Sequence, residues 1–239
     1  MLEKEMYPYV KDFFASRGFE VRAEVLACDV VAVKDDIMVA AEMKTQMSIK
    51  LLSQAAQRQK SFDLVYIAIP KPTFKKRTGK QYAELMHLIK RLELGLLYVD
   101  TNGEGVCTEE FPPHPFAREK SLASRRARKT RTDAMEEFLS RSEDYNTGGS
   151  VREKRITAYR ENALLIALYI VRDGAMSAKQ LKKLGCGEKA YNIIHDNHYG
   201  WFERVDKGIY DVTQKGKKSV AKYKNVCENL KKIMQEKQI

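Results

Sequence analysis

The sequence predicts an α/β protein in two modules: a mixed sheet flanked by helices, then a smaller module of helices and a β-hairpin. Three observations predict this fold class. Residues 1–112 alternate between helix-like and strand-like apolar patterns, the run FPPHPFA (residues 111–117) can continue neither a helix nor a central strand, and helical periodicity returns afterwards. We therefore expect a first domain over residues 1–112, a basic connector over residues 113–150 and a second domain over residues 151–239.

The first module is predicted to begin with a helix. Apolar residues recur at helical spacing through residues 7–16, and Gly18 ends this helix. Pro8 fits only near the first turn, which places Glu5 at or just before the helix start. Three strand-like runs follow, at residues 19–25, 28–33 and 37–44.

A helix–strand–helix–strand pattern completes the first module. Ser48 can cap a helix that runs to about residue 60. Residues 64–69 (LVYIAI) are apolar throughout, as expected for a strand that is buried on both faces. A helix over residues 80–94 and a strand over residues 96–99 follow.

The second module is predicted to contain a helix at residues 156–172, short helices at 178–184 and 188–195, a hairpin at 201–213 and a helix at 215–237. Three helices followed by a hairpin is the order of a winged helix. Lys189 and Asn192 lie on the third of these helices, which enters the major groove of DNA in that arrangement. Winged modules also dock on proteins, and both interpretations stay open.

The net positive charge of the chain lies entirely in its second half. Residues 1–112 contain 16 Lys and Arg against 16 Asp and Glu, so residues 113–239 carry the entire net charge of +11. Part of it lies in REKSLASRRARKTR (residues 118–131), which is either a solvated helix or an arm that follows phosphates. The surplus predicts a polyanionic partner and salt-dependent binding. The candidate phosphate contacts in this run are Arg125, Arg126, Arg128 and Lys129.

Composition points to a cytoplasmic protein without a membrane segment. The longest apolar run, residues 163–171, is far shorter than the roughly 20 residues of a membrane-spanning helix. No signal peptide is visible, and the four cysteines lack the spacing of metal ligands.

A hairpin is expected around the run KDDI. If Asp35 and Asp36 form a two-residue turn, Lys34 pairs with Ile37, and the numbers of paired residues sum to 71. A four-residue loop preserves this register, whereas a three-residue loop shifts it. In the first two cases Asp29 and Glu42 lie opposite each other on one face of the sheet.

Two facing carboxylates destabilise a sheet unless a cation lies between them. Asp29, Glu42 and the backbone carbonyl of Met43 form a hard oxygen set that suits Mg²⁺ or Mn²⁺. Lys44 shares the face of Glu42, where it can orient a metal-activated water or stabilise negative charge on phosphorus. This pattern predicts metal-dependent hydrolysis of a phosphodiester.

Asp29 and the E-M-K run at residues 42–44, with their flanking elements, resemble the PD-(D/E)xK nuclease superfamily. The resemblance implies a restriction-endonuclease-like sheet flanked by helices. It also implies a supporting acid on the first helix, which would be Glu5, and a polar residue on the helix after the lysine, which would be Gln54. Cys28 stands where the superfamily motif has proline.

A narrower resemblance covers most of the chain. The runs EMYPYVKDFF, CDVVAV, NTGGS, TAYR and YGWFERV are similar to those of a bacterial family of PD-(D/E)xK-type phosphodiesterases without an assigned substrate. The expected function is therefore Mg²⁺- or Mn²⁺-dependent cleavage of nucleic acid, with DNA as the first substrate and RNA as the second. Arg58, one turn after Gln54, would meet phosphate, and Glu24 on the first strand ranks behind the other candidates.

Other functions fit the same residues. A non-catalytic DNA-binding or regulatory protein would use the winged module on an inactive nuclease-like core, and a structural adaptor would use it to bind protein. A homodimer would suit cleavage of both strands of a duplex.

Overall fold

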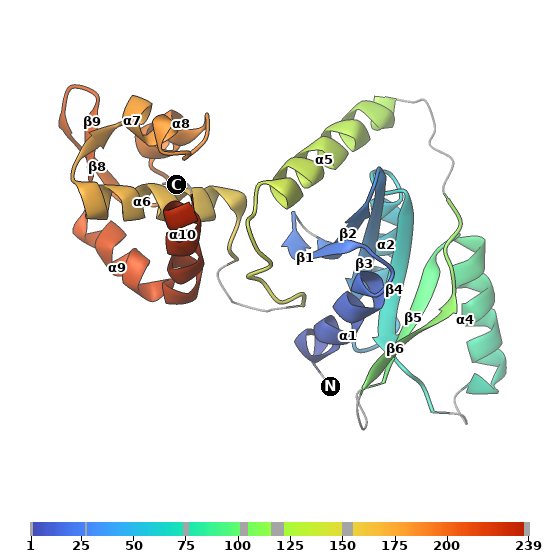
Figure 1. The fold of residues 1–239 in the computed structure, drawn as a ribbon. Helices are drawn as coiled ribbons and strands as arrows, with labels where there is room; N and C mark the ends of the chain where they lie inside the picture. The colour runs from blue at the N-terminus through green and yellow to red at the C-terminus, as the bar shows by residue number, and fades with distance from the viewer. Residues whose placement is uncertain are drawn as a thin grey trace. The chain divides into compact units, whose positions relative to one another are not determined.

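The structure is a computed structural model, and it describes residues 2–26, 28–73, 77–100, 105–115, 122–149 and 155–236 (Figure 1). Of these, the side chains of residues 122–125 and 236 are not described. The chain divides into two compact units, Met1–Arg155 and Ile156–Ile239.

A six-stranded mixed sheet forms the centre of the first unit. The strands lie in the order β1-β2-β3-β4-β5-β6; the pairs β3–β4 and β4–β5 are parallel and the others are antiparallel. The strands are β1 (Glu20–Val25), β2 (Cys28–Lys34), β3 (Ile37–Met43), β4 (Leu64–Pro70), β5 (Gly95–Asp100) and β6 (Val106–Phe111). The sequence predicts all of them except β6, an edge strand whose mostly exposed and acidic composition hides its strand character.

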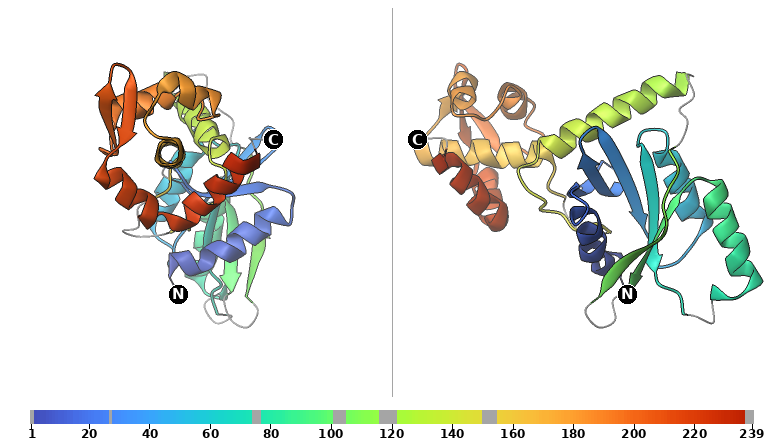
Figure 2. Two further views of the ribbon diagram at one scale, coloured as in Figure 1. Left: turned by 60° about the vertical axis from the view of Figure 1, so that its left-hand side comes forward. Right: turned by 45° about the vertical axis from the view of Figure 1, so that its right-hand side comes forward.

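Helices cover both faces of this sheet, as the sequence predicts. They are α1 (Glu3–Ala15), α2 (Ile49–Arg58), α4 (Lys80–Arg91) and α5 (Leu122–Leu139). One buried layer joins α1 to the sheet, and a second layer joins residues of α2, α4 and α5 to the opposite face. The right-hand view of Figure 2 shows α1 and α4 on opposite sides of the strands.

The first helix begins four residues earlier than predicted. Met6 and Tyr7 are buried, and fully burying an apolar side chain contributes about 1.5–3 kcal/mol. Pro8 lies inside the helix, where it removes one backbone hydrogen bond at a cost of about 3 kcal/mol. The burial of two large side chains offsets that cost, so the helix extends through the proline to Glu3.

The segment expected to be a connector contributes a helix to the first unit. Ala134 and Phe138, one turn apart in α5, are fully buried against the sheet. The Arg131 guanidinium donates hydrogen bonds to an Asp63 carboxylate oxygen at 2.7 Å and to the Asp36 carbonyl at 2.8 Å. From residue 122 onward this run forms a helix, whereas residues 118–121 lie outside the described part of the chain. The first unit extends to Arg155 rather than ending near residue 112.

The second unit contains five helices and three strands within its described residues. These are α6 (Ala158–Asp173), β7 (Met176–Ser177), α7 (Ala178–Lys183), α8 (Ala190–Asp196), β8 (Phe202–Asp206), β9 (Ile209–Val212), α9 (Gln214–Lys222) and α10 (Lys224–Glu236). The strands form a sheet in the order β7-β9-β8. The predicted final helix is interrupted at Tyr223, and the two-residue β7 is too short to leave a sequence pattern.

Two of the family-like runs, TAYR and YGWFERV, meet inside this unit. The Arg160 guanidinium lies 4.9 Å from the centre of the Tyr199 ring, and the Tyr159 and Tyr199 rings are 5.4 Å apart. Tyr199 also packs on Trp201, the single tryptophan of the chain. The two runs therefore form one aromatic cluster, in which Trp201 is buried and Tyr159, Arg160 and Tyr199 are half-buried.

Within the described ranges, no helix combines the length and the apolar character needed to cross a bilayer.

Candidate active site

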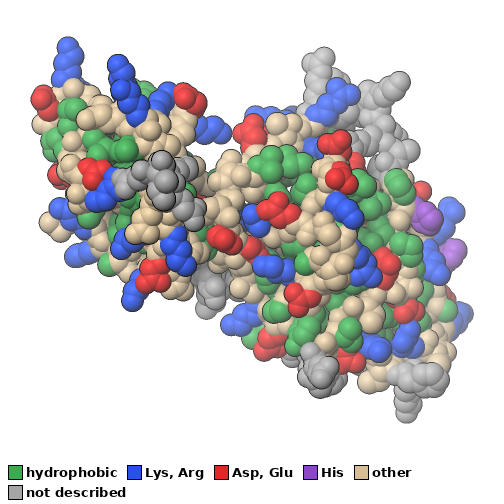
Figure 3. All heavy atoms as spheres, in the orientation of Figure 1, with side chains coloured by type: hydrophobic (Ala, Val, Ile, Leu, Met, Phe, Trp, Pro, Cys, Tyr) green, Lys and Arg blue, Asp and Glu red, His purple; other side chains and the backbone are tan. Residues whose placement is uncertain are grey.

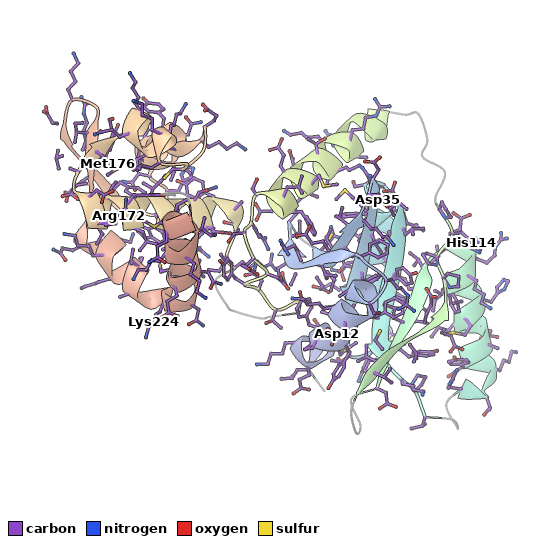
Figure 4. The ribbon with its side chains drawn as sticks, in the orientation of Figure 1. Asp12, Asp35, His114, Arg172, Met176 and Lys224 are labelled. Carbon is purple, nitrogen blue, oxygen red and sulfur yellow. The ribbon has the colours of Figure 1, made fainter. Side chains whose placement is uncertain are left out.

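The β2–β3 hairpin has the predicted register. Lys34 pairs with Ile37 and Val30 with Ala41, so paired residue numbers sum to 71 along the hairpin. Asp35, in the turn, lies at one end of the hairpin (Figure 4), and the Asp29 and Glu42 positions lie at the other. The predicted register is therefore confirmed, and continuing it by one residue places Asp29 opposite Glu42.

Asp29 is fixed by the neighbouring strand. Its Oδ2 accepts a hydrogen bond from the Met43 backbone N–H at 2.9 Å. Burial raises the pKa of the Asp29 carboxyl above its usual value, against the opposing influence of the Met43 hydrogen bond and the Lys44 ammonium. Since the N–H and C=O of one strand residue point the same way, the Met43 carbonyl also faces the β2 side.

Glu42 lies in the middle of the sheet and is only 2% exposed. Its Oε1 accepts a hydrogen bond from Arg58 Nε at 2.6 Å, which forms an ion pair across β3 and α2. Burial and the adjacent Asp29 carboxylate raise the pKa of Glu42 to about 7, although Arg58 acts in the opposite direction. A buried acid with this pKa exchanges its proton near neutrality.

Lys44 follows β3 and contacts the first helix. Its Nζ donates to Glu3 Oε2 at 2.8 Å. Burial disfavours the charged form, but the Glu3 hydrogen bond and the nearby Asp29 and Glu42 carboxylates outweigh it and raise the pKa of Lys44. The lysine is therefore a cation at neutral pH, next to two acids.

The acid of α1 that contacts Lys44 is Glu3, whereas the predicted supporting acid, Glu5, makes a different contact. Glu5 is exposed, and its Oε2 accepts from the Leu2 backbone N–H at 2.6 Å, at the start of the helix. Residues two apart in a helix lie on nearly opposite sides. The buried stripe of α1, extended back one turn from Met6 and Tyr7, reaches Glu3 and would have identified it.

Gln54 lies on α2, one turn before Arg58 and on the same face of the helix. Among the described residues, none makes a hydrogen bond to its buried Oε1, and leaving an amide oxygen unpaired is costly. Ser48 caps this helix by accepting from the Leu51 N–H at 3.2 Å, so the helix start is fixed next to the lysine strand. Gln54 shares this helix face with Arg58, the partner of Glu42, so its oxygen can accept a hydrogen bond from a ligand that binds there.

The residues present fit a hard divalent cation in donor chemistry. Asp29, Glu42 and the Met43 carbonyl offer oxygen ligands, and Mg²⁺ commonly takes its remaining ligands from water and substrate phosphate. In the part of the chain that the structure describes, no group of three or more His, Cys, Asp or Glu side chains is arranged to hold a metal ion. The fit therefore rests on two carboxylates, a carbonyl and the unpartnered Gln54 oxygen.

The predicted phosphate-binding residues are distributed over both units. Arg126, Arg128 and Lys129 are exposed on α5, whereas the Arg125 side chain lies outside the described part of the structure. Arg58 is partly exposed and pairs with Glu42. Lys189 and Asn192 are exposed at the start and in the first turn of α8. On the face drawn in Figure 3, Lys and Arg side chains of both units alternate with Asp and Glu.

Residues 110–219 match the model of a family described as "Putative PD-(D/E)XK phosphodiesterase (DUF2161)". This is the family that the sequence resembles, so the resemblance is confirmed over these residues. The matched stretch contains α5 and most of the second unit, and it does not include Asp29, Glu42 or Lys44.

A solved structure, the SPO1766 protein of unknown function from Silicibacter pomeroyi, shares 14% sequence identity with the chain. The match covers 59% of this chain and 86% of that chain, with a TM-score of 0.38, and carries no functional inference. No curated protein matches the chain.

Proposed function

We propose, from the match of residues 110–219 to a phosphodiesterase family, that the chain is a metal-dependent nuclease that cleaves DNA. One observation carries the proposal: Asp29, Glu42 and the ammonium of Lys44 converge at the end of the β2–β3 hairpin. The match lies outside this site, so the geometry of the first unit supports the chemistry independently.

Asp29 and Glu42 would hold Mg²⁺ or Mn²⁺ together with the Met43 carbonyl. Such an ion supplies a water of lowered pKa and polarises the phosphate. Lys44, protonated and held by Glu3, orients the attacking water and stabilises negative charge on the phosphate oxygens. The unpartnered Oε1 of Gln54 accepts a hydrogen bond from a water or a substrate group next to Glu42.

DNA would be bound through phosphate contacts of the basic side chains. The exposed Arg126, Arg128 and Lys129 belong to the same unit as the site, and they are the phosphate contacts that we propose for this unit. In the second unit, three helices, a hairpin and the β7-β9-β8 sheet support a winged-helix module. Its helix α8 would present Lys189 and Asn192 to a groove of the duplex.

Cleavage of single- and double-stranded DNA by wild type and Lys44→Ala, with Mn²⁺ and with EDTA, tests the proposal. Wild-type cleavage that needs Mn²⁺ and falls about 100-fold or more in the variant supports it, because Lys44 would act on the developing charge. Lys34→Ala is the matched control: this lysine lies at the turn end of the same hairpin and donates to the Arg17 carbonyl at 2.9 Å. RNA of the same sequence is the competing substrate.

Two results would contradict the nuclease proposal. Equal cleavage by wild type and Lys44→Ala would place the reaction elsewhere. Faster cleavage of RNA than of DNA would support the same hydrolysis with RNA, not DNA, as the substrate.

The ion pair between Arg58 and Glu42 favours a second candidate, a DNA-binding protein with an inactive core. A guanidinium 2.6 Å from Glu42 Oε1 satisfies the charge that a metal would otherwise neutralise. Thermal unfolding of wild type and Arg58→Gln with and without Mn²⁺ separates the two candidates. DNA retention without cleavage, and no rise of Tm with Mn²⁺ in either protein, would establish the second candidate.

A further inference from the structure

A segment distant in sequence borders the candidate site. Residues 141–149, here called the strap, follow α5 and pass along β1 and α1. Arg141 is 3% exposed and donates to the Ala23 carbonyl at 2.9 Å and to the Glu24 carbonyl at 3.0 Å. The strap thus pairs with backbone groups of an edge strand that would otherwise need water.

Asp144 joins α1, which carries Glu3, to β1, the strand that pairs with the strand of Asp29. Its carboxylate accepts from the Tyr7 hydroxyl and from Lys11 Nζ at 2.7 Å, both on α1. The other oxygen accepts from the Ala23 backbone N–H of β1 at 3.0 Å. The Asp144 side chain is 6% exposed, so one buried carboxylate fixes the helix to the edge of the sheet.

The two glycines of the strap lie against the site itself. A Cβ at Gly148 would come within 2.8 Å of the Asp29 carbonyl oxygen and of the Met43 Cε. A Cβ at Gly149 would lie 2.5 Å from Glu3 Cβ, and Gly149 has a φ of +74°. Only residues without a side chain fit here, which gives the family-like run NTGGS a structural reason.

The strap also holds the buried Glu24, an acid that the nuclease motif does not use. The Gly149 N–H donates to Glu24 Oε1 at 3.0 Å, and Arg155 pairs with Glu24 Oε2 at 2.6 Å. Glu24 has a φ of 55°, a backbone conformation that is costly for a residue with a Cβ and persists only where its surroundings hold it. The end of β1 is therefore fixed by residues more than 120 positions later. This end pairs with Cys28, which precedes Asp29 in β2.

We infer that the strap is the positioning element of the candidate metal site, an inference that rests on the proposed function. Strap side chains and glycines touch the backbone of Asp29, the Cβ of Glu3 and the strand β1. The strap therefore acts on the site through those groups. Ligand groups must be held to within about 0.5 Å for tight binding. Loosening the strap therefore weakens metal binding while the fold is retained.

The variant Gly148→Ala tests this inference, with Gly79→Ala as the matched control. Gly148 lies against Asp29, whereas a Cβ at Gly79 meets no heavy atom within 4 Å. Mn²⁺ binding to the full chain is measured by calorimetry well below the Tm of each variant. We expect the Mn²⁺ dissociation constant to rise about tenfold or more in Gly148→Ala, the usual effect of disturbing groups that orient metal ligands, and to stay constant in Gly79→Ala.

Tyr7→Phe is a milder second variant, because it removes only the hydroxyl that reaches Asp144. We expect it to weaken Mn²⁺ binding in the same direction, with cleavage restored at saturating Mn²⁺ and an unchanged KM for DNA. A lowered Tm with wild-type Mn²⁺ affinity in both variants would overturn the inference, because the strap would then serve stability alone. Absence of Mn²⁺ binding by the wild type would overturn the proposed function, and the inference with it.

Discussion

At the scale of single residues, two opposing effects act on the pKa of Glu42. Burial and the nearby Asp29 raise its pKa to about 7, and Arg58 favours its ionised form. An acid whose pKa is higher in the folded than in the unfolded protein binds protons preferentially in the folded state. Its contribution to stability is therefore complete below about pH 4.5 and is lost as the pH rises through about 7.

Replacing Glu42 by glutamine should remove this dependence on pH. At about pH 5 the wild-type carboxyl is protonated and resembles an amide, whereas at about pH 7.5 it carries a buried charge. In EDTA, the free energy of unfolding of Glu42→Gln relative to wild type should therefore increase by about 1 kcal/mol or more from the lower to the higher pH. Urea unfolding at both pH values measures it, and a constant difference would mean that Glu42 has an ordinary pKa.

At the scale of elements, α5 is a structural part of the first unit and a carrier of exposed positive charge. Its buried side holds Ala134 and Phe138, its Arg131 is bonded to Asp63, and Arg126 and Arg128 are exposed. Arg126 and Arg128 therefore belong to a helix that packs on the sheet. A flexible arm would lose more conformational entropy on binding.

Phe138→Ala should test the packing of α5 on the sheet. Phe138 is fully buried, so its truncation should lower the free energy of unfolding by about 3–5 kcal/mol. The adjacent Leu139 is 67% exposed, and Leu139→Ala should change the same quantity by no more than about 0.5 kcal/mol. Urea unfolding followed by circular dichroism compares them; equal effects would mean that α5 does not pack as described.

Local patterns predict those parts of the fold that local physics determines. The two-residue turn at Asp35 sets the hairpin register, and that register alone places Asp29 opposite Glu42. The sequence does not identify Glu3, because Pro8 predicts a helix start close to it and the burial of Met6 and Tyr7 is not visible in the sequence. Asp144 is missed because its partners lie 121 to 137 residues away, and no periodicity connects such positions.

At the scale of the whole molecule, the first unit includes α5 and the strap, and it ends at Arg155 rather than near residue 112. The buried Phe138 and Arg141 and the Asp144 carboxylate all belong to residues 1–155 and contact elements formed before residue 112. A chain cut at residue 112 therefore lacks core side chains and leaves β1 unsatisfied along its edge.

A fragment of residues 1–155 should fold by itself, and a fragment of residues 1–112 should not. The longer fragment keeps the buried groups of α5 and the strap, whereas the shorter one exposes the surface they cover. Thermal unfolding followed by circular dichroism should show a cooperative transition for the longer fragment only. A cooperative transition of residues 1–112 near the Tm of the longer fragment would contradict this.

The distance in sequence between Ala23 and Asp144, 121 residues, has a consequence for the order of folding. Closing a loop of that length costs more entropy than closing the hairpin, so the contact forms after the local elements have formed. During synthesis, the ribosome releases the carboxylates and the lysine long before it releases the glycines that border them. On the proposed function, a nascent chain would carry Asp29, Glu42 and Lys44 before the strap holds them in place, and cleavage would begin only after residue 149 has emerged.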